Sequence, residues 1–168
     1  VMGIIAGILD GCGYHALKGS LMTRGAREVA RLMKAMGGNE LSAYGLAHLG
    51  DYEATLFSEF SHNRKYGEML VQGEKFAKLA EGVPTAAAMK ALADKYNVDL
   101  PLTCAVYELC YAESEEGYRE RCEKMLSKLY GNCVVEIHDP CYNQTKVVCF
   151  SLYAIDFAVF KAYTLLSC

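Results

Sequence analysis

Charged residues are spread very unevenly along this chain of 168 residues, and the position of the break limits how the chain can fold. The first 130 residues hold 32 of the 37 charged side chains. The last 38 residues hold four of the eight cysteines and only five charges, at Glu136, Asp139, Lys146, Asp156 and Lys161. A break this sharp, near Tyr130–Gly131, is typical of a domain boundary. We therefore expect one domain over residues 1–130 and a tail of different origin over residues 131–168.

The composition predicts a packed domain and excludes several classes of protein. Hydrophobic residues make up 52% of the chain and charged residues 22%, which is enough for a core. The net charge of −3 gives no basic footprint for nucleic acid as a main partner. No apolar run is long enough to span a membrane, and the opening VMGIIAGILDG lacks the basic start of a signal peptide. We interpret the eight cysteines as reduced thiols of a cytoplasmic protein.

The first 130 residues are expected to be helical throughout. Apolar positions in residues 16–36 can share one helix face, and Gly37-Gly38 is a typical helix end. Pro101 can open a further helix, and residues 115–130 are charged and periodic. No alternating strand pattern precedes residue 130. The fold class predicted is therefore all-α, a helical bundle followed by an irregular C-terminal tail.

Shorter helices are expected between these longer ones. Ser42 is a candidate cap for a helix that ends at Gly50, and Asn63 for one that ends at Gly73. Pro84 fits the first turn of another. The chain opens on apolar residues without a cap or a methionine, as if it began inside a helix.

The tail allows two interpretations. Segments such as Val147-Val148 favour strands, but residues 147–160 equally suit a buried helix. The spacing of Cys133, His138, Cys141 and Cys149 admits tetrahedral zinc in principle, yet it contains no CxxC pair and fits no standard zinc motif. We therefore predict no metal site, and we interpret the tail as a fused or misread segment.

Three stretches, taken in order, carry a family pattern. They read AGILDGCGYHALKGSLMTRG over residues 6–25, GLAHLGDYEATLFSEFSHNRKYG over 45–67 and LAEGVPT over 79–85. Together they resemble the C-terminal, substrate-binding domain of NAD(P)-dependent glycerol-3-phosphate dehydrogenase. The resemblance covers roughly residues 1–128. It implies an all-helical domain of the 6-phosphogluconate dehydrogenase type.

The resemblance also implies an activity for the parent enzyme. Such enzymes interconvert glycerol 3-phosphate and dihydroxyacetone phosphate with NAD or NADP, and they feed glycerophospholipid synthesis. The chain contains no GxGxxG, so it lacks the dinucleotide-binding half. The family's proton-accepting lysine aligns about two residues before Val1, so no residue of this chain is assigned a catalytic role. We expect the chain alone to be inactive. The alternative is a helical module without catalysis, or a gene fragment, that serves only assembly; a homodimer is left open.

Substrate and cofactor contacts carry over residue by residue. The resemblance places Asp51 on glycerol phosphate and Ser61, His62 and Asn63 on the phosphate end. His62 stands where the family has arginine, so a neutral imidazole replaces a permanent charge. The nearby Arg64 is the candidate to replace that charge. Two groups follow as expectations: substrate contacts at Asp51, Thr55, Ser61, His62, Asn63 and Arg64, and cofactor contacts at His62, Leu79 and Glu81.

Each of these residues has a plainer interpretation. Ser61 to Lys65 can be a helix cap followed by solvated cations. Asp51 can be a turn residue after Gly50, and Glu81 a surface charge. Arg24, in the Thr-Arg-Gly of the first stretch, is expected to brace helices.

Overall fold

The computed structural model describes residues 1–131, and within them Val1–Leu129 form one compact unit. That part of the chain is helical and contains no strand, so the all-α prediction is confirmed. The predicted tail, its cysteines and its zinc spacing lie outside the described residues, and the boundary at residue 130 stays a prediction. The helices are α1 (Met2–Gly11), α2 (Lys18–Ala35), α3 (Asp51–Phe57), α4 (His62–Gln72), α5 (Gly82–Tyr96), α6 (Pro101–Tyr111) and α7 (Tyr118–Gly131), with short turns η1 (His15–Leu17), η2 (Glu40–Tyr44) and η3 (Leu46–Gly50).

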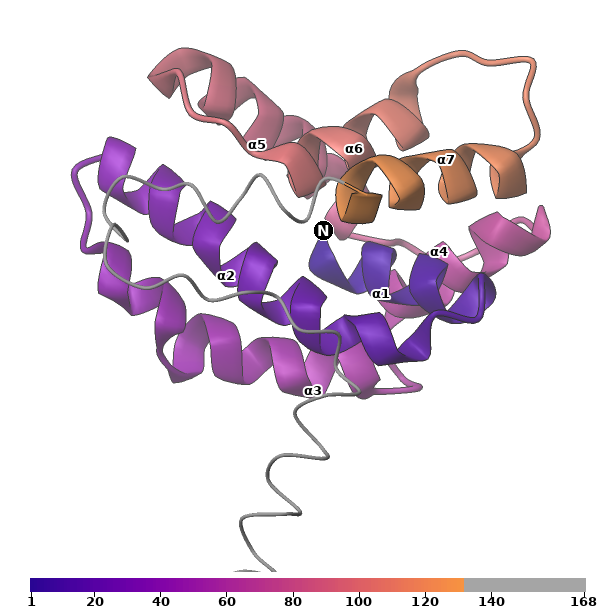
Figure 1. Cartoon of the computed structure of the whole chain (residues 1–168), viewed down its shortest axis with the longest axis horizontal. Coiled ribbons are helices and arrows are strands. Elements are labelled where there is room, and N and C mark those ends of the chain that lie inside the picture. Colours follow the sequence, from indigo (N-terminus) through magenta and orange to yellow (C-terminus); the bar gives the residue numbers. More distant parts are fainter. Residues whose placement is uncertain (132–168) are drawn as a thin grey trace, which may run out of the picture. The chain divides into compact units, whose positions relative to one another are not determined.

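Helix α1 is the centre of this unit. It contacts α2, α3, α4, α5 and α6, and Met2 to Leu9 are all buried. In Figure 1 the indigo α1 lies between α2 and α3 below and the α5, α6 and α7 layer above. A helix that is apolar on all sides is stable only when it is buried, and this explains why α1 lies in the core.

Glycines allow α1 and α4 to touch backbone to backbone. Gly3, Gly7 and Gly11 recur every fourth residue and face α4. A Cβ added to Gly7 would overlap the carbonyl oxygen of Arg64, and one added to Gly67 would overlap that of Ile4. Neither overlap can be relieved by a side-chain rotation because both atoms belong to the backbone. The two helices therefore pack closer than any side chain would permit.

Helix α2 begins and ends close to the predicted positions. Gly37 adopts φ +82°, a conformation that glycine reaches without strain, and Gly38 N–H donates to the Met33 carbonyl at 2.8 Å. The Arg24 side chain donates to the Leu129 carbonyl at 2.6 Å, which confirms the expected brace and ties α2 to α7.

Two predicted caps differ from the structure. Residues 40–50 form a 3₁₀ turn and a π turn instead of a helix capped by Ser42. Asn39 caps the 3₁₀ turn by accepting the Leu41 N–H at 3.0 Å, and the π turn has no side-chain cap. Helix α4 begins after Ser61, whose hydroxyl accepts the Arg64 N–H at 3.3 Å. Asn63, the predicted cap, lies inside the helix, and its side chain bonds to α5 instead.

A buried carboxylate caps α6. Glu28 of α2 is 1% exposed and accepts the Leu102 N–H at 2.5 Å, the Thr103 N–H at 3.2 Å and the Thr103 hydroxyl at 2.9 Å. Burial raises the pKa of Glu28 to about 7, although these hydrogen bonds and Arg31 oppose the rise. Glu28 thus satisfies the first amides of α6 at a desolvation cost.

Replacing Gly7 by alanine should destabilise the fold strongly. The new methyl group would meet the Arg64 carbonyl, so we expect a loss of about 3 kcal/mol in the free energy of unfolding, measured with urea. Gly19→Ala is the matched control, because nothing lies within 4 Å of its added Cβ and α2 is helical there. That control should be neutral or more stable by up to about 1 kcal/mol. Equal effects in the two variants would contradict the close α1–α4 contact.

The pH dependence of the free energy of unfolding should reveal the titration of Glu28. Its folded pKa is raised, so the folded state holds a proton that the unfolded state releases, and the free energy of unfolding should fall as pH rises from about 4.5 to 7. The fall should be as large as roughly 3 kcal/mol. Urea unfolding of Glu28→Gln should lack this component, whereas Glu53→Gln, at an exposed position, should keep it. Parallel pH profiles in all three proteins would exclude titration of Glu28 in that range.

Candidate functional site

Four helices converge at Asn63. A Cβ placed on Gly3 of α1 would lie 2.9 Å from the Asn63 Cβ and 3.4 Å from the Thr55 Cγ2 of α3. The Asn63 Oδ1 accepts the N–H of Gly82, the first residue of α5, at 2.8 Å. A Cβ on Gly82 would lie 3.0 Å from the nitrogen of Val1. Two of the predicted substrate residues, Thr55 and Asn63, are therefore neighbours beside the start of α1.

The first turn of α4 offers hydrogen-bond donors at the same place. The Ser61 oxygen accepts the Arg64 N–H, which leaves the hydroxyl hydrogen of Ser61 as a donor. The first amides of an α-helix have no acceptor within the helix, and those of α4 belong to His62 and Asn63. The positive end of the helix dipole lies there as well. These groups suit an anion.

His62 faces a pocket on the outer side of this turn. Its ring is edge-on to Phe76, with 6.1 Å between the ring centroids. The pocket has a volume of about 580 Å³, and its lining combines aromatic, basic and acidic side chains: Glu59, Phe60, His62, Lys65, Lys75, Phe76 and Lys78. Three lysines against one glutamate place His62, which stands where the family has arginine, in locally basic surroundings.

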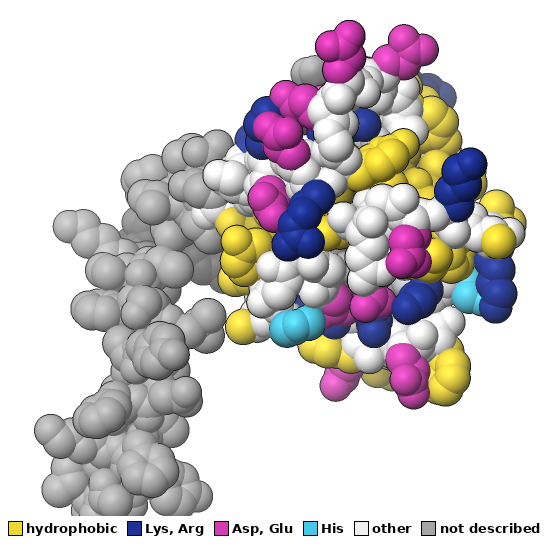
Figure 2. Space-filling view, turned by 90° about the vertical axis from the view of Figure 1, so that its right-hand side faces the viewer, with side chains coloured by type: hydrophobic (Ala, Val, Ile, Leu, Met, Phe, Trp, Pro, Cys, Tyr) yellow, Lys and Arg dark blue, Asp and Glu magenta, His cyan; other side chains and the backbone are white. Residues whose placement is uncertain are grey.

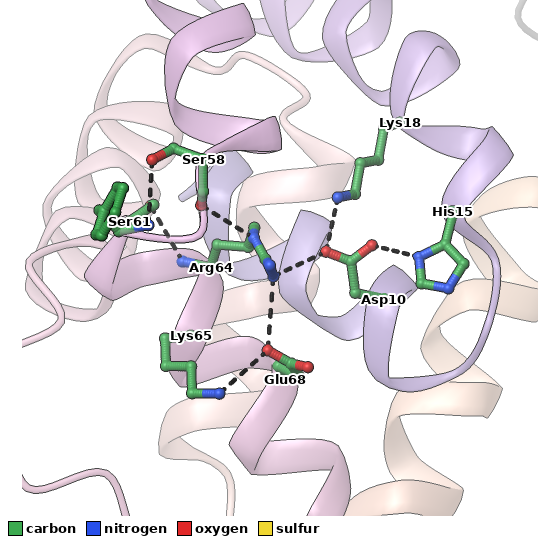
Figure 3. A network of polar contacts seen from close by, with 9 residues as sticks. Asp10, His15, Lys18, Ser58, Ser61, Arg64, Lys65 and Glu68 are labelled. Carbon is green, nitrogen blue, oxygen red and sulfur yellow. Dashed lines mark hydrogen bonds and ion pairs between the residues drawn. The ribbon is translucent and has the colours of Figure 1, made fainter.

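The guanidinium of Arg64 is turned toward protein acceptors. Its Nη1 lies 3.1 Å from Asp10 Oδ2 and 3.5 Å from Glu68 Oε2, and its Nε donates to the Ser58 carbonyl at 3.0 Å (Figure 3). The Arg64 side chain is 17% exposed. To bind phosphate as predicted, the Arg64 guanidinium would have to give up some of these contacts within the protein.

Asp10 was not singled out by sequence reasoning. Its carboxylate lies 2.6 Å from Lys18 Nζ and 2.7 Å from His15 Nδ1, and it also pairs with Arg64. A signal for it existed in the sequence, because Asp10 is the first charged residue of the chain and ends an apolar helix. A charge in that position requires partners.

The remaining predicted residues lie at helix starts or in an exposed segment. Asp51 opens α3, is exposed and lies one turn before Thr55, as its spacing predicted. Leu79 is 67% exposed, and the exposed Glu81 directly precedes Gly82 at the start of α5. Glu81 is thereby next in sequence to the residue that Asn63 contacts.

Two wider features frame the site. Within residues 1–131 no group of His, Cys, Asp and Glu side chains could hold a metal ion, and no helix is long and apolar enough to cross a membrane. The face shown in Figure 2 mixes basic, acidic and hydrophobic side chains instead of presenting one dominant charge.

Comparisons with known proteins identify the family that this chain resembles. Residues 1–117 match the family described as NAD-dependent glycerol-3-phosphate dehydrogenase C-terminus. A glycerol-3-phosphate dehydrogenase [NAD(P)+] of Solidesulfovibrio magneticus is 37% identical over 123 residues, 68% of this chain and 37% of the relative. One from Aromatoleum aromaticum is 38% identical over 136 residues, 76% of this chain and 41% of the relative.

A solved structure extends the likeness to the fold. The crystal structure of glycerol-3-phosphate dehydrogenase from Coxiella burnetii matches with a TM-score of 0.63 and 29% identity, covering 74% of this chain and 40% of that one. The chain therefore spans about two fifths of the length of the relatives it matches.

Removing the Asn63 side chain should loosen the contact between α4 and α5. Asn63→Ala leaves the buried Gly82 N–H without its acceptor, so we expect a loss of about 1–2 kcal/mol in the free energy of unfolding. Asn63→Asp keeps an oxygen there and should lose less. Asn39→Ala removes a comparable bond at an exposed turn and serves as the control. If, in urea unfolding, Asn63→Ala lowered the free energy of unfolding no more than Asn39→Ala does, the bond from Gly82 to Asn63 would not contribute to stability.

Proposed function

This chain belongs to the NAD-dependent glycerol-3-phosphate dehydrogenase family, through its C-terminal domain, and from that premise we propose that it is the substrate-binding part of an oxidoreductase. The reaction proposed is the interconversion of glycerol 3-phosphate and dihydroxyacetone phosphate with NAD or NADP, a step that feeds glycerophospholipid synthesis. The proposed location is the cytoplasm, supported by the free thiols of Cys12, Cys104, Cys110 and Cys122.

The convergence at Asn63 is the observation that carries this proposal. The substrate is a phosphate monoester, and a dianion needs several donors and a positive field. Asn63 uses its oxygen on Gly82, so its side-chain NH₂ is left to donate. The Ser61 hydroxyl and the first amides of α4 lie in the same turn. We propose that these groups bind the phosphate and that His62 adds charge when protonated.

The glycerol end of the substrate is assigned to α3. Asp51 and Thr55 lie one turn apart on this helix, and Thr55 faces the start of α1. A carboxylate and a hydroxyl there can hydrogen-bond the hydroxyl groups of glycerol. The family's proton-accepting lysine aligns about two residues before Val1, whose nitrogen lies beside Gly82. A residue at that position would enter the site next to Asn63 and could take the hydroxyl proton as hydride leaves.

Cofactor contacts are proposed for His62, Leu79 and Glu81. Leu79 is exposed, and Glu81 borders the start of α5 beside Asn63. His62 lies on the basic pocket of the same turn. This chain contributes an edge of the cofactor site, and the dinucleotide itself supplies the hydride chemistry.

A titration with glycerol 3-phosphate tests the proposed site. In two-dimensional NMR of the 168-residue chain, the amide signals of Ser61, His62, Asn63 and Gly82 should shift saturably. Asn63→Ala should weaken binding about tenfold, because a phosphate oxygen loses its donor. Saturable shifts confined to other residues would contradict the proposal and would favour the alternative of a module that serves assembly only.

Replacing His62 tests whether its side chain approaches the phosphate. His62→Arg places a permanent charge at this position and should tighten binding severalfold. His48→Arg adds the same charge at η3 and is the control, which should keep the wild-type affinity. Equal affinities for the wild type and His62→Arg would show that His62 does not approach the phosphate.

A further inference from the structure

One carboxylate gathers two cationic side chains and a histidine. Asp10 lies 2.6 Å from Lys18 and 3.1 Å from Arg64, and its Oδ1 lies 2.7 Å from the Nδ1 of the exposed His15. The side chains of Asp10 and Lys18 are 7% and 8% exposed. An ion pair with so little solvent contact is costly to break, because the remaining partner is left as an uncompensated buried charge. The cluster is therefore a firm connection and not a solvated surface pair.

This cluster joins segments that are far apart in the sequence. Asp10 ends α1, Lys18 begins α2, and Arg64 is in the first turn of α4 (Figure 3). Lys18 also lies over the ring of Phe57 at the end of α3, 5.3 Å from its centroid. The guanidinium of Arg64 extends the cluster to the Ser58 carbonyl at 3.0 Å. The turn between α3 and α4 is thus held against the end of α1.

Arg64 connects to this turn at two points. Its backbone N–H bonds to the Ser61 hydroxyl oxygen and its side chain bonds to the Ser58 carbonyl. The Ser58 hydroxyl in turn accepts the Phe60 N–H at 3.1 Å. Residues 58–61 are therefore fixed from both ends, and the residues that follow, His62 and Asn63, start α4 in a defined direction.

We propose that Arg64, held by Asp10, is a positioning residue for the phosphate site of Ser61 to Asn63. This inference rests on the proposed function. The charge of Arg64 is already matched by Asp10 and Glu68, so Arg64 orients the turn without contacting the phosphate. The alternative from the sequence is that Arg64 binds phosphate directly. The two roles predict opposite changes in phosphate affinity when Asp10 is neutralised.

Asp10→Asn separates the two roles. If Arg64 positions the turn through its ion pair, then neutralising Asp10 loosens the turn and weakens phosphate binding. If Arg64 bound phosphate directly, the same change would release its charge and would strengthen binding. The variants needed are Asp10→Asn, Arg64→Gln and the double variant. Arg119→Gln breaks an exposed Arg–Glu pair on α7 and is the matched control.

The first measurement is the NMR titration with glycerol 3-phosphate on the 168-residue chain. We expect Asp10→Asn and Arg64→Gln each to raise Kd about tenfold, and the double variant to raise it no further, because both changes break one unit. Arg64→Lys keeps a cation for Asp10 and should recover part of the affinity. If Arg64→Gln fails to fold, Arg64→Lys is measured in its place, and its affinity should lie between that of the wild type and that of Asp10→Asn. Arg119→Gln should leave Kd unchanged.

The second measurement needs no ligand. The Gly82 amide, which donates to Asn63, should exchange its hydrogen about tenfold faster in Asp10→Asn than in the wild type, and at the wild-type rate in Arg119→Gln. Unchanged exchange in Asp10→Asn, unchanged binding, or binding that tightens would each overturn the positioning role. Failure of the wild-type chain to bind would instead contradict the proposed function, and the exchange rates would still test the positioning role.

Discussion

Direct backbone contact between α1 and α4 is the constraint on which the rest of the structure depends. Gly7 and Gly67 lie where any side chain would overlap a carbonyl oxygen of the opposite helix. Because the helices are this close, Gly3 meets Asn63 at the start of α4, and the side chain of the adjacent Arg64 reaches Asp10 near the end of α1. The same contact therefore supports both the proposed phosphate site and the ion pair that orients it.

Burial and charge act together in this arrangement. Helix α1 is too apolar for solvent, and its single charge, Asp10, is acceptable only because cations from α2 and α4 surround it. Glu28 is also a buried carboxylate, but hydrogen bonds from α6 satisfy it instead of cations, and burial raises its pKa to about 7. Each buried carboxylate connects helices: Asp10 joins α1 to α2 and α4, and Glu28 joins α2 to α6.

Local patterns predicted most of the fold and part of the site. The periodicity of residues 16–36, the glycine stop after them and Pro101 all mark real helix ends, because these signals act within one turn. The short helix predicted to start at Ser42 and end at Gly50 is instead a 3₁₀ turn capped by Asn39 and a separate π turn, because Asn39 offers a competing cap before Ser42. The helical spacing of Asp51 and Thr55 is confirmed. The pairing of Asp10 with Arg64 was invisible to local patterns, because the two residues meet only through the packing of α1 on α4.

A crystal structure of this chain with glycerol 3-phosphate tests the central claim most directly. The account predicts the phosphate at the first turn of α4, within hydrogen-bond distance of the Ser61 hydroxyl and the Asn63 side-chain NH₂. Arg64 should remain on Asp10 in that structure. A phosphate bound by Arg64 after it has left Asp10, or one bound only among Lys65, Lys75 and Lys78, would contradict the account.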